Sequence, residues 1–154
     1  SSILNFFGWI EPSYHFQDSK YDFEELYISD INAELINAYQ AVKNDVDNLI
    51  AKLNEMQMLF LPMDENGRKY FYYTVRERFN STTLTEETAT EKAAQFIFLN
   101  KTCFNGLYRV NRKGQFNVPM GAYKNPTILR KFSRSTSKRN YCLRRLHAFQ
   151  VVYR

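Results

Sequence analysis

Acidic side chains are missing from the second part of this 154-residue chain. All 16 Asp and Glu residues lie at or before Glu91, where seven basic residues accompany them. Residues 92–154 carry 14 basic side chains and no acidic one, so the two parts have net charges of −9 and +14. A solvated charged face is the usual explanation of a charge run. A stretch this long without one carboxylate instead favours a surface that binds a polyanion.

Cysteine and long apolar runs are also scarce. The two cysteines, Cys103 and Cys142, lie in unrelated contexts, which excludes a disulfide framework and a cysteine-based metal site. No run of 18 or more apolar residues is present, so we expect no membrane partner. We therefore expect a cytoplasmic protein without a bound metal.

Apolar and aromatic residues, in contrast, are plentiful. Hydrophobic residues make up 44% of the chain and aromatic residues 16%, with 11 Tyr and 13 Phe. This content excludes a disordered chain, and the length suffices for one compact domain with its own core. The aromatic side chains should serve in packing or in stacking.

The spacing of apolar residues predicts one short strand followed by three helices. Residues 27–30 begin with apolar side chains and end with polar ones, which indicates a short strand. Asn32 is a helix N-cap candidate, and apolar residues then recur every three or four positions, which predicts one long helix over about 33–59. A shorter helix is expected around 70–79, and a buried helix over about 86–104.

Two β-prone runs with a basic turn between them follow the third helix. Residues 107–110 and 115–118 flank the turn at 111–114, whose glycine suits a positive φ angle. This pattern predicts a β-hairpin over about 107–118. After Pro126 the composition changes abruptly to Arg, Lys and Ser.

The predicted hairpin has the shape and charge of a DNA-reading element. A two-stranded ribbon fits the major groove of B-form DNA. Arg109 could read a base, because its guanidinium can bond guanine O6 and N7 together. Arg112, Lys113 and Lys124 could meet phosphates, which position a protein without reading sequence. The residues alone leave open an ordinary exposed turn, since such residues are common there.

Two blocks of the chain resemble one enzyme family. Residues 100–119 read Asn-Lys-Thr-Cys-Phe-Asn-Gly-Leu-Tyr-Arg-Val-Asn-Arg-Lys-Gly-Gln-Phe-Asn-Val-Pro. This block is similar to the target-recognition segment of Dam-type DNA adenine-N6 methyltransferases of the D12 class. Upstream, residues 28–39 resemble the second strand and following helix of the same family. The order and spacing agree, and the resemblance covers about residues 15–126.

The resemblance implies a Rossmann-like α/β methyltransferase that uses S-adenosylmethionine and acts on double-stranded DNA. In that family the acidic residue ending the second strand accepts hydrogen bonds from the ribose hydroxyls of the cofactor. Asp30, followed by Ile31, occupies the matching position, in line with the general logic of nucleotide-binding sheets. Judged from the residues alone, a cap of the next helix is the favoured interpretation of Asp30.

The resemblance also implies individual roles in DNA binding. Arg109 would read a guanine and Leu107 would touch a thymine methyl group of a GATC-like site, while Asn105 and Asn111 would hold backbone or bases. Phe104 would insert beside the flipped adenine, whose amine cannot be reached within the stack; a core phenylalanine ending the helix is the alternative. The DNA-binding candidates are Phe104, Asn105, Leu107, Arg109, Asn111, Arg112, Lys113, Pro119, Tyr123 and Lys124. The family commonly has Gly-Arg-Tyr-Lys where this chain has Gly-Ala-Tyr-Lys, so one basic contact is lost.

Several family motifs are missing from this sequence. Neither the Lys-Trp-x-Gly-Gly-Lys segment nor the glycine-rich Phe-Glu-Pro-Phe-x-Gly-x-Gly loop is found. The catalytic Asp-Pro-Pro-Tyr motif is also absent, since no aspartate follows Asp64. We therefore assign no catalytic residue and expect a homologue that is inactive alone.

These absences predict an incomplete fragment of the family fold, truncated or divergent at both ends. It should be mainly α-helical, with a projecting β-hairpin and a remnant of the sheet. Residues 1–32 would belong to the cofactor-binding part, 33–126 to a helical target-recognition region, and 127–154 to a basic tail unlike the family. A second polypeptide would then supply the catalytic half. The alternatives are a stand-alone DNA-binding module and a non-functional fragment.

Overall fold

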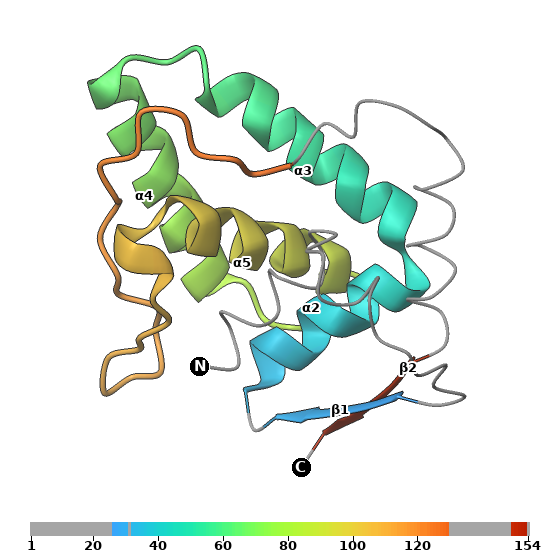
Figure 1. Cartoon of the computed structure of the whole chain (residues 1–154). Coiled ribbons are helices and arrows are strands. Elements are labelled where there is room, and N and C mark those ends of the chain that lie inside the picture. The colour runs from blue at the N-terminus through green and yellow to red at the C-terminus, as the bar shows by residue number, and fades with distance from the viewer. Residues whose placement is uncertain (1–25, 31, 130–148, 154) are drawn as a thin grey trace, which may run out of the picture.

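The computed structural model describes residues 26–30, 32–129 and 149–153 (Figure 1). Helices dominate these residues, and the two short strands lie together at one end of the molecule (Figure 1). In chain order the elements are β1 (Leu26–Asp30), α2 (Ala33–Asn44), α3 (Val46–Phe60), α4 (Glu65–Ser81), α5 (Ala89–Thr102), the 3₁₀ turn η1 (Phe104–Gly106) and β2 (Phe149–Tyr153). No helix among them is long and apolar enough to cross a membrane.

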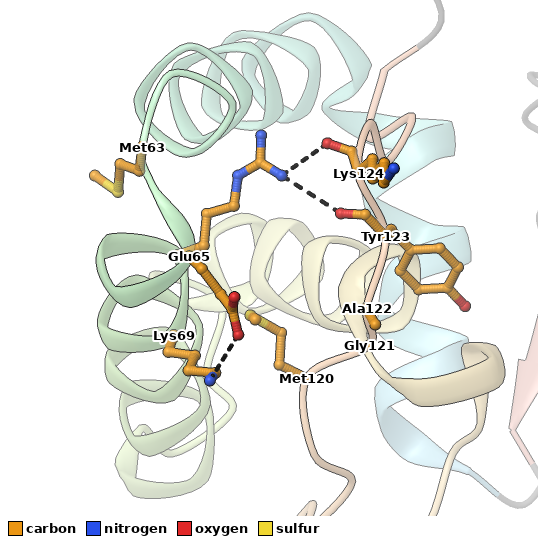
Figure 2. A pocket seen from close by; sticks show the side chains of 9 residues that line it. Met63, Glu65, Lys69, Met120, Gly121, Ala122, Tyr123 and Lys124 are labelled. Atoms are coloured by element: carbon orange, nitrogen blue, oxygen red, sulfur yellow. Dashed lines mark hydrogen bonds and ion pairs between the residues drawn. The ribbon is translucent and has the colours of Figure 1, made fainter.

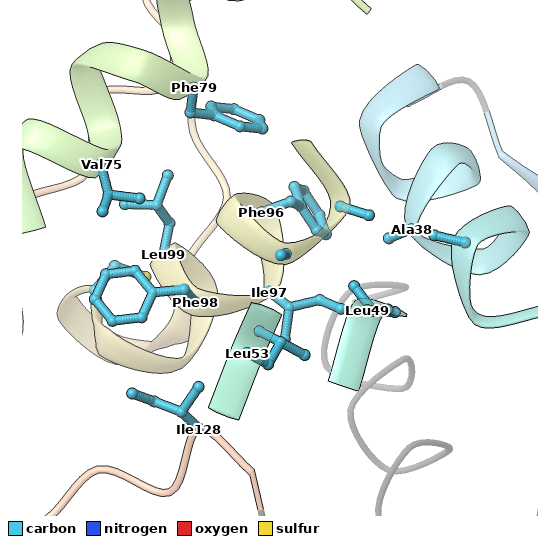
Figure 3. Packing of buried hydrophobic residues seen from close by; sticks show 14 of the residues in the cluster. Ala38, Leu49, Leu53, Val75, Phe79, Phe96, Ile97, Phe98, Leu99 and Ile128 are labelled. Atoms are coloured by element: carbon cyan, nitrogen blue, oxygen red, sulfur yellow. The ribbon is translucent and has the colours of Figure 1, made fainter. Parts of the chain in front are cut away.

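Helix α5 is the centre of the packing. Residues 92–100 are all buried, because α2, α3 and α4 each contact this helix. Its apolar side chains therefore point in several directions into the surrounding helices (Figure 3). Phe98, for example, meets the rings of Phe60 and Phe71 edge-on, with centroids 5.2 and 5.4 Å away. A helix that is buried on all sides has such a central place.

A buried lysine joins three of the helices. Lys92 of α5 is only 4% exposed, and its Nζ lies 3.1 Å from a carboxylate oxygen of Glu34 at the start of α2. The same ammonium donates to the carbonyl oxygens of Phe79 and Thr82 at the end of α4, at 2.9 and 2.7 Å. A cation is favourable there because the C-terminal carbonyls of a helix carry partial negative charge.

Helices are present in the regions where they were predicted, but their first and last residues differ from the prediction. Asn32 does cap α2, since its Oδ1 accepts from the backbone N–H groups of Glu34 and Leu35. The single helix expected over 33–59 is wrong, because Asp45 leaves helical geometry at φ −144° and ψ 41°. Its carboxylate accepts from the hydroxyl of Thr90 at 2.7 Å, so the residue at the break is bonded to the start of α5.

The other two helices also begin elsewhere than expected. Helix α4 starts at Glu65, because Asp64 caps it by accepting from the backbone N–H of Gly67 at 2.8 Å. Helix α5 starts only at Ala89, since the hydroxyl of Thr88 donates to the Thr83 carbonyl at 2.6 Å and closes a turn before it.

The predicted β-hairpin over 107–118 is not confirmed. The segment reverses direction at the expected turn, where Asn111 N–H donates to the Gln115 carbonyl at 2.8 Å. Within 107–118, however, the two arms share only an isolated bridge between Val110 and Phe116 and form no regular strands. From Phe116 onward, side chains of α4 form hydrogen bonds with backbone groups that a neighbouring strand would otherwise have bonded.

The two strands run parallel, with Leu26 beside Phe149 and Asp30 beside Tyr153. The expected strand therefore does end at Asp30, although this pair by itself does not confirm a remnant of the family's sheet. Two residues that follow residue 126, the expected end of the target-recognition region, contact the helices. Ile128 is buried in the core, and the Leu129 N–H donates to Oε1 of Gln57 at 2.8 Å.

Replacing Lys92 by methionine should destabilise the protein strongly. The change keeps the volume of the side chain but leaves the half-buried Glu34 carboxylate and the end of α4 without their cation. We expect a loss of about 3 kcal/mol or more in the free energy of unfolding, measured by urea denaturation. Lys52→Met is the matched control: the exposed Lys52–Glu91 pair should contribute less than about 1 kcal/mol. Equal losses in the two variants would contradict a special role for Lys92.

Candidate nucleic-acid interface

Four polar side chains of α4 hold the segment 104–124 in place. Arg68, Tyr72, Arg76 and Asn80 recur every fourth residue, so they share one face of the helix. All four donate to backbone carbonyl oxygens of that segment. We call these four side chains the α4 clamp.

The clamp bonds the second arm of the segment most closely. Asn80 pairs with both backbone groups of Phe116, accepting from its N–H at 2.8 Å and donating to its carbonyl at 2.9 Å. The Tyr72 hydroxyl donates to the Val118 carbonyl at 2.8 Å, and Arg76 donates to the same oxygen at 3.2 Å. Burial raises the pKa of the Tyr72 hydroxyl far above its usual value, so the hydroxyl stays a neutral donor.

Arg68 fixes the end of the segment. Its guanidinium donates to the carbonyl oxygens of Tyr123 and Lys124 at 3.4 and 2.8 Å and to that of Leu61 at 2.6 Å. These bonds border a shallow pocket of about 340 Å³ between the start of α4 and residues 120–124 (Figure 2). The exposed Lys69–Glu65 ion pair lies on the helix side of this pocket (Figure 2).

The segment opens on a tight turn that exposes Phe104. Asn105 and Gly106 both have left-handed backbones, with φ angles of 54° and 59°, and the Asn100 side chain donates to the Gly106 carbonyl at 3.0 Å. The Phe104 N–H donates to the Pro119 carbonyl at 2.9 Å, which anchors the turn. The Phe104 side chain is 50% exposed, so it is not the core phenylalanine that the sequence left as an alternative.

The side chain of Arg109 is exposed but held by a neighbour. Its Nε donates to Oδ1 of Asn117 at 2.9 Å, and one terminal nitrogen lies 3.4 Å from the Asn117 carbonyl oxygen. The Asn117 N–H in turn donates to the Arg109 carbonyl at 3.1 Å. These contacts orient the guanidinium and leave its remaining donors for another acceptor. Leu107, two residues earlier, is 48% exposed.

The side chain of Asn111 closes the turn. Its Oδ1 accepts from the backbone N–H groups of Lys113 and Gln115 at 2.9 and 3.0 Å, and its amide donates to the Gln115 side chain at 3.0 Å. All of these bonds lie within the segment. The side chains of Arg112 and Lys113 are exposed at the tip, where Gly114 has a φ angle of 76°.

The charge on this surface is of one sign. Residues 104–124 include four basic and no acidic side chains. Within the part of the chain that the structure describes, no carboxylate forms a salt bridge with Arg109, Arg112, Lys113 or Lys124. The exposed segment therefore combines cations with the half-exposed apolar side chains of Phe104, Leu107 and Tyr123.

Several predicted site residues thus lie on one exposed segment, but two lie elsewhere. Asp30 is the last residue of β1, which is the predicted position, whereas Ile31 lies outside the described residues. Their contact with a cofactor stays a prediction. The described residues include no group of three or more His, Cys, Asp or Glu side chains that could hold a metal ion.

Sequence reasoning missed the α4 clamp and Asn117 as an orienting residue. The four clamp residues are spaced every fourth position in the sequence, but only the apolar spacing of the same helix was used to predict it.

Cys103 is a residue of a reactive type that the fold makes unreactive. Burial raises the pKa of its thiol to about 11, so little thiolate exists at neutral pH.

Substituting Gly121 by alanine should loosen the segment. An added Cβ would lie 2.8 Å from the backbone oxygen of Cys103 and 2.5 Å from the Tyr123 ring. The backbone oxygen cannot yield easily, so we expect a loss of about 1 to 3 kcal/mol in the free energy of unfolding, measured by urea denaturation. Ala122→Ser, an exposed change next to it, should cost less than about 0.5 kcal/mol. An unchanged stability of the Gly121 variant would contradict this close approach.

The comparisons with known proteins agree on one family. The family model of the D12 class N6 adenine-specific DNA methyltransferases matches residues 13–145, which extends beyond the expected end of the resemblance near residue 126. The chain is 56% identical over 109 residues to the type II methyltransferase M.MjaIII of Methanocaldococcus jannaschii, covering 71% of this chain and 37% of that protein.

Two further relatives are named DNA adenine methylase. The protein of Vibrio cholerae is 40% identical over 105 residues, covering 68% of this chain and 35% of that protein. The protein of Haemophilus influenzae is 41% identical over 103 residues, covering 67% of this chain and 33% of that protein. This chain spans about a third of the length of the curated relatives that it matches. Because the family model matches most of the chain, the protein belongs to the D12 class N6 adenine-specific DNA methyltransferases.

Proposed function

We propose that this chain is the target-recognition part of a site-specific DNA adenine-N6 methyltransferase, and that it reads double-stranded DNA through residues 104–124. One observation carries the proposal: Arg109 is exposed, oriented by Asn117, and unpaired with any described carboxylate. A guanidinium held in this way loses little freedom when it bonds guanine O6 and N7.

The neighbouring side chains support the same function. Leu107 offers an apolar contact for a thymine methyl group. Phe104 can fill the space of an extruded adenine, whose amine is out of reach within the stack. Arg112, Lys113 and Lys124 supply phosphate contacts that add affinity without sequence preference. Asn105, Pro119 and Tyr123 complete the proposed DNA surface, and a GATC-like site is the proposed target.

S-adenosylmethionine is the proposed methyl donor of the complete enzyme, and it supplies an electrophilic methyl group when bound. Asp30 fits the ribose part of this cofactor, because it ends a strand in a parallel pair and is followed closely by the N-terminus of α2. Ile31, the next residue in the sequence, is the second proposed cofactor contact. The Asp-Pro-Pro-Tyr motif is absent from this sequence, so we propose that a second polypeptide supplies the catalytic groups.

Arg109→Ala should relax sequence preference. We expect it to reduce discrimination between a GATC duplex and single-substituted duplexes by about 1 to 3 kcal/mol, measured by fluorescence anisotropy at fixed salt. Lys113→Ala is the matched control, because a lost phosphate contact should weaken all duplexes alike and make the salt dependence shallower. An Arg109 variant that weakens all duplexes equally would contradict base reading by this residue.

The chain alone should transfer no methyl group. With tritiated S-adenosylmethionine and a GATC duplex, we expect no incorporation into DNA, because this sequence lacks the Asp-Pro-Pro-Tyr motif that would hold the adenine amine for attack. Incorporation should appear when a polypeptide carrying the Asp-Pro-Pro-Tyr motif is added. Activity of the chain alone would contradict the proposal. Duplex binding without activity under either condition would favour a stand-alone DNA-binding module.

A further inference from the structure

The pocket between the start of α4 and residues 120–124 has an excess of positive charge. Glu65 and Lys69 lie on one side of it and residues 121–124 on the other (Figure 2). Arg68, Lys69 and Lys124 line the pocket, and Glu65 is the one carboxylate among its lining residues, so three positive charges face one negative charge. Its volume of about 340 Å³ is about ten times the ~30 Å³ that one water molecule occupies in the liquid. The pocket therefore has the charge and the room for an anionic group.

The backbone acceptors in the pocket wall are already bonded. The carbonyl oxygens of Tyr123 and Lys124 carry partial negative charge and would repel an anion. Both accept from the guanidinium of Arg68, at 3.4 and 2.8 Å. A guanidinium has only donors and stays charged at any ordinary pH. Arg68 thus compensates the carbonyl groups, and the two lysines remain for a ligand.

Lys69 is paired with Glu65, but only weakly. Its Nζ lies 2.8 Å from Oε1 of Glu65, which is one helical turn earlier. The side chains of Lys69 and Glu65 are 52% and 77% exposed, and an ion pair between such exposed groups contributes little, because water and salt screen it. Lys69 can therefore leave Glu65 at small cost for an acceptor that offers a charge-assisted hydrogen bond, such as a phosphate oxygen.

The pocket lies on a continuation of the candidate DNA surface. The segment 104–124 runs along α4 toward the start of that helix, since Phe116 is bonded to Asn80 and Lys124 to Arg68. Asn80 and Arg68 are separated by about 18 Å along the helix axis, at a rise of about 1.5 Å per residue. The pocket is thus well removed from the turn and its base-reading candidates. A contact there would meet the DNA backbone outside the stretch that reads bases.

We propose that this pocket binds a phosphodiester group of the DNA backbone, and that Lys69 exchanges Glu65 for this phosphate when the duplex binds. The inference rests on the proposed function and adds a contact that lies outside residues 104–124. Lys69 and Lys124 hold the phosphate from two sides of the pocket, which adds affinity without sequence preference. Glu65 competes with the phosphate for Lys69 and therefore lowers the affinity for DNA.

The first test removes the cation. Lys69→Gln should weaken binding of a GATC duplex and of single-substituted duplexes by the same factor, measured by fluorescence anisotropy on the full chain. One phosphate contact contributes about 0.9 to the slope of log affinity against log salt. The loss should therefore be about 3.5-fold smaller at 200 mM than at 50 mM salt. Lys52→Gln is the matched control, because Lys52 is also paired with a carboxylate, Glu91, but does not line the pocket.

The second test removes the competitor. Glu65→Gln should strengthen duplex binding at low salt by about two- to fivefold, the range expected for release of an exposed ion pair. A gain in affinity cannot come from a variant that fails to fold. Glu91→Gln is its matched control and should bind like the wild type. Once Lys69→Gln is present, adding Glu65→Gln should give a much smaller gain, because the two side chains act on the same phosphate.

The outcomes separate this inference from the proposed function. Wild-type binding with an unchanged salt slope in Lys69→Gln would overturn the phosphate site, as would a Glu65→Gln variant that binds no better than the wild type. Millimolar inorganic phosphate at constant ionic strength should leave duplex binding unchanged. If it reduced wild-type affinity to that of Lys69→Gln, the pocket would be a site for free phosphate, and the proposal would be wrong. Absence of duplex binding by the wild type would reject the proposed function, and this inference with it.

Discussion

Four side chains of one helix take the place of a neighbouring β-strand in this protein. The α4 clamp bonds the backbone of residues 116–124, which would otherwise be irregular chain with unpaired carbonyl groups. Because Arg68, Tyr72, Arg76 and Asn80 come from a rigid helix, the segment is held without a sheet. Its outer side chains can then remain exposed, which is the condition for reading a base edge.

The clamp depends in turn on a core organised around α5. This helix is buried on all sides, so α2, α3 and α4 can pack only in places that its surface provides. Lys92 adds a polar constraint to this apolar packing, since its ammonium joins the start of α2 to the end of α4. Tyr108 also packs against this core, with its ring beside those of Phe96 and Phe116. The candidate DNA surface is thus attached to the packed helices.

Much of this arrangement could be predicted from the sequence. Apolar spacing indicated the helices, Asn32 was recognised as a cap, and residues 100–119 indicated the family. The residues alone could not decide between an exposed and a buried Phe104, and they did not predict the break at Asp45, because each depends on distant residues. Asp45 is held by Thr90, and the turn after Phe104 is anchored by Pro119. The β-prone runs at 107–118 predicted a hairpin that is not confirmed, since β propensity reflects a residue's surroundings more than its backbone.

The sequence by itself determined the charge division, the helical periodicity, the family and the identity of the basic segment. These depend on residue type and local spacing, which are written in the chain. Only the tertiary structure decided which polar side chains are occupied in holding the fold and which remain for a ligand. Asn111 and Arg76 are engaged with the segment's own atoms, while Arg109 keeps donors exposed after bonding Asn117. That difference depends on contacts that only the folded chain creates, and the local spacing of residues does not predict them.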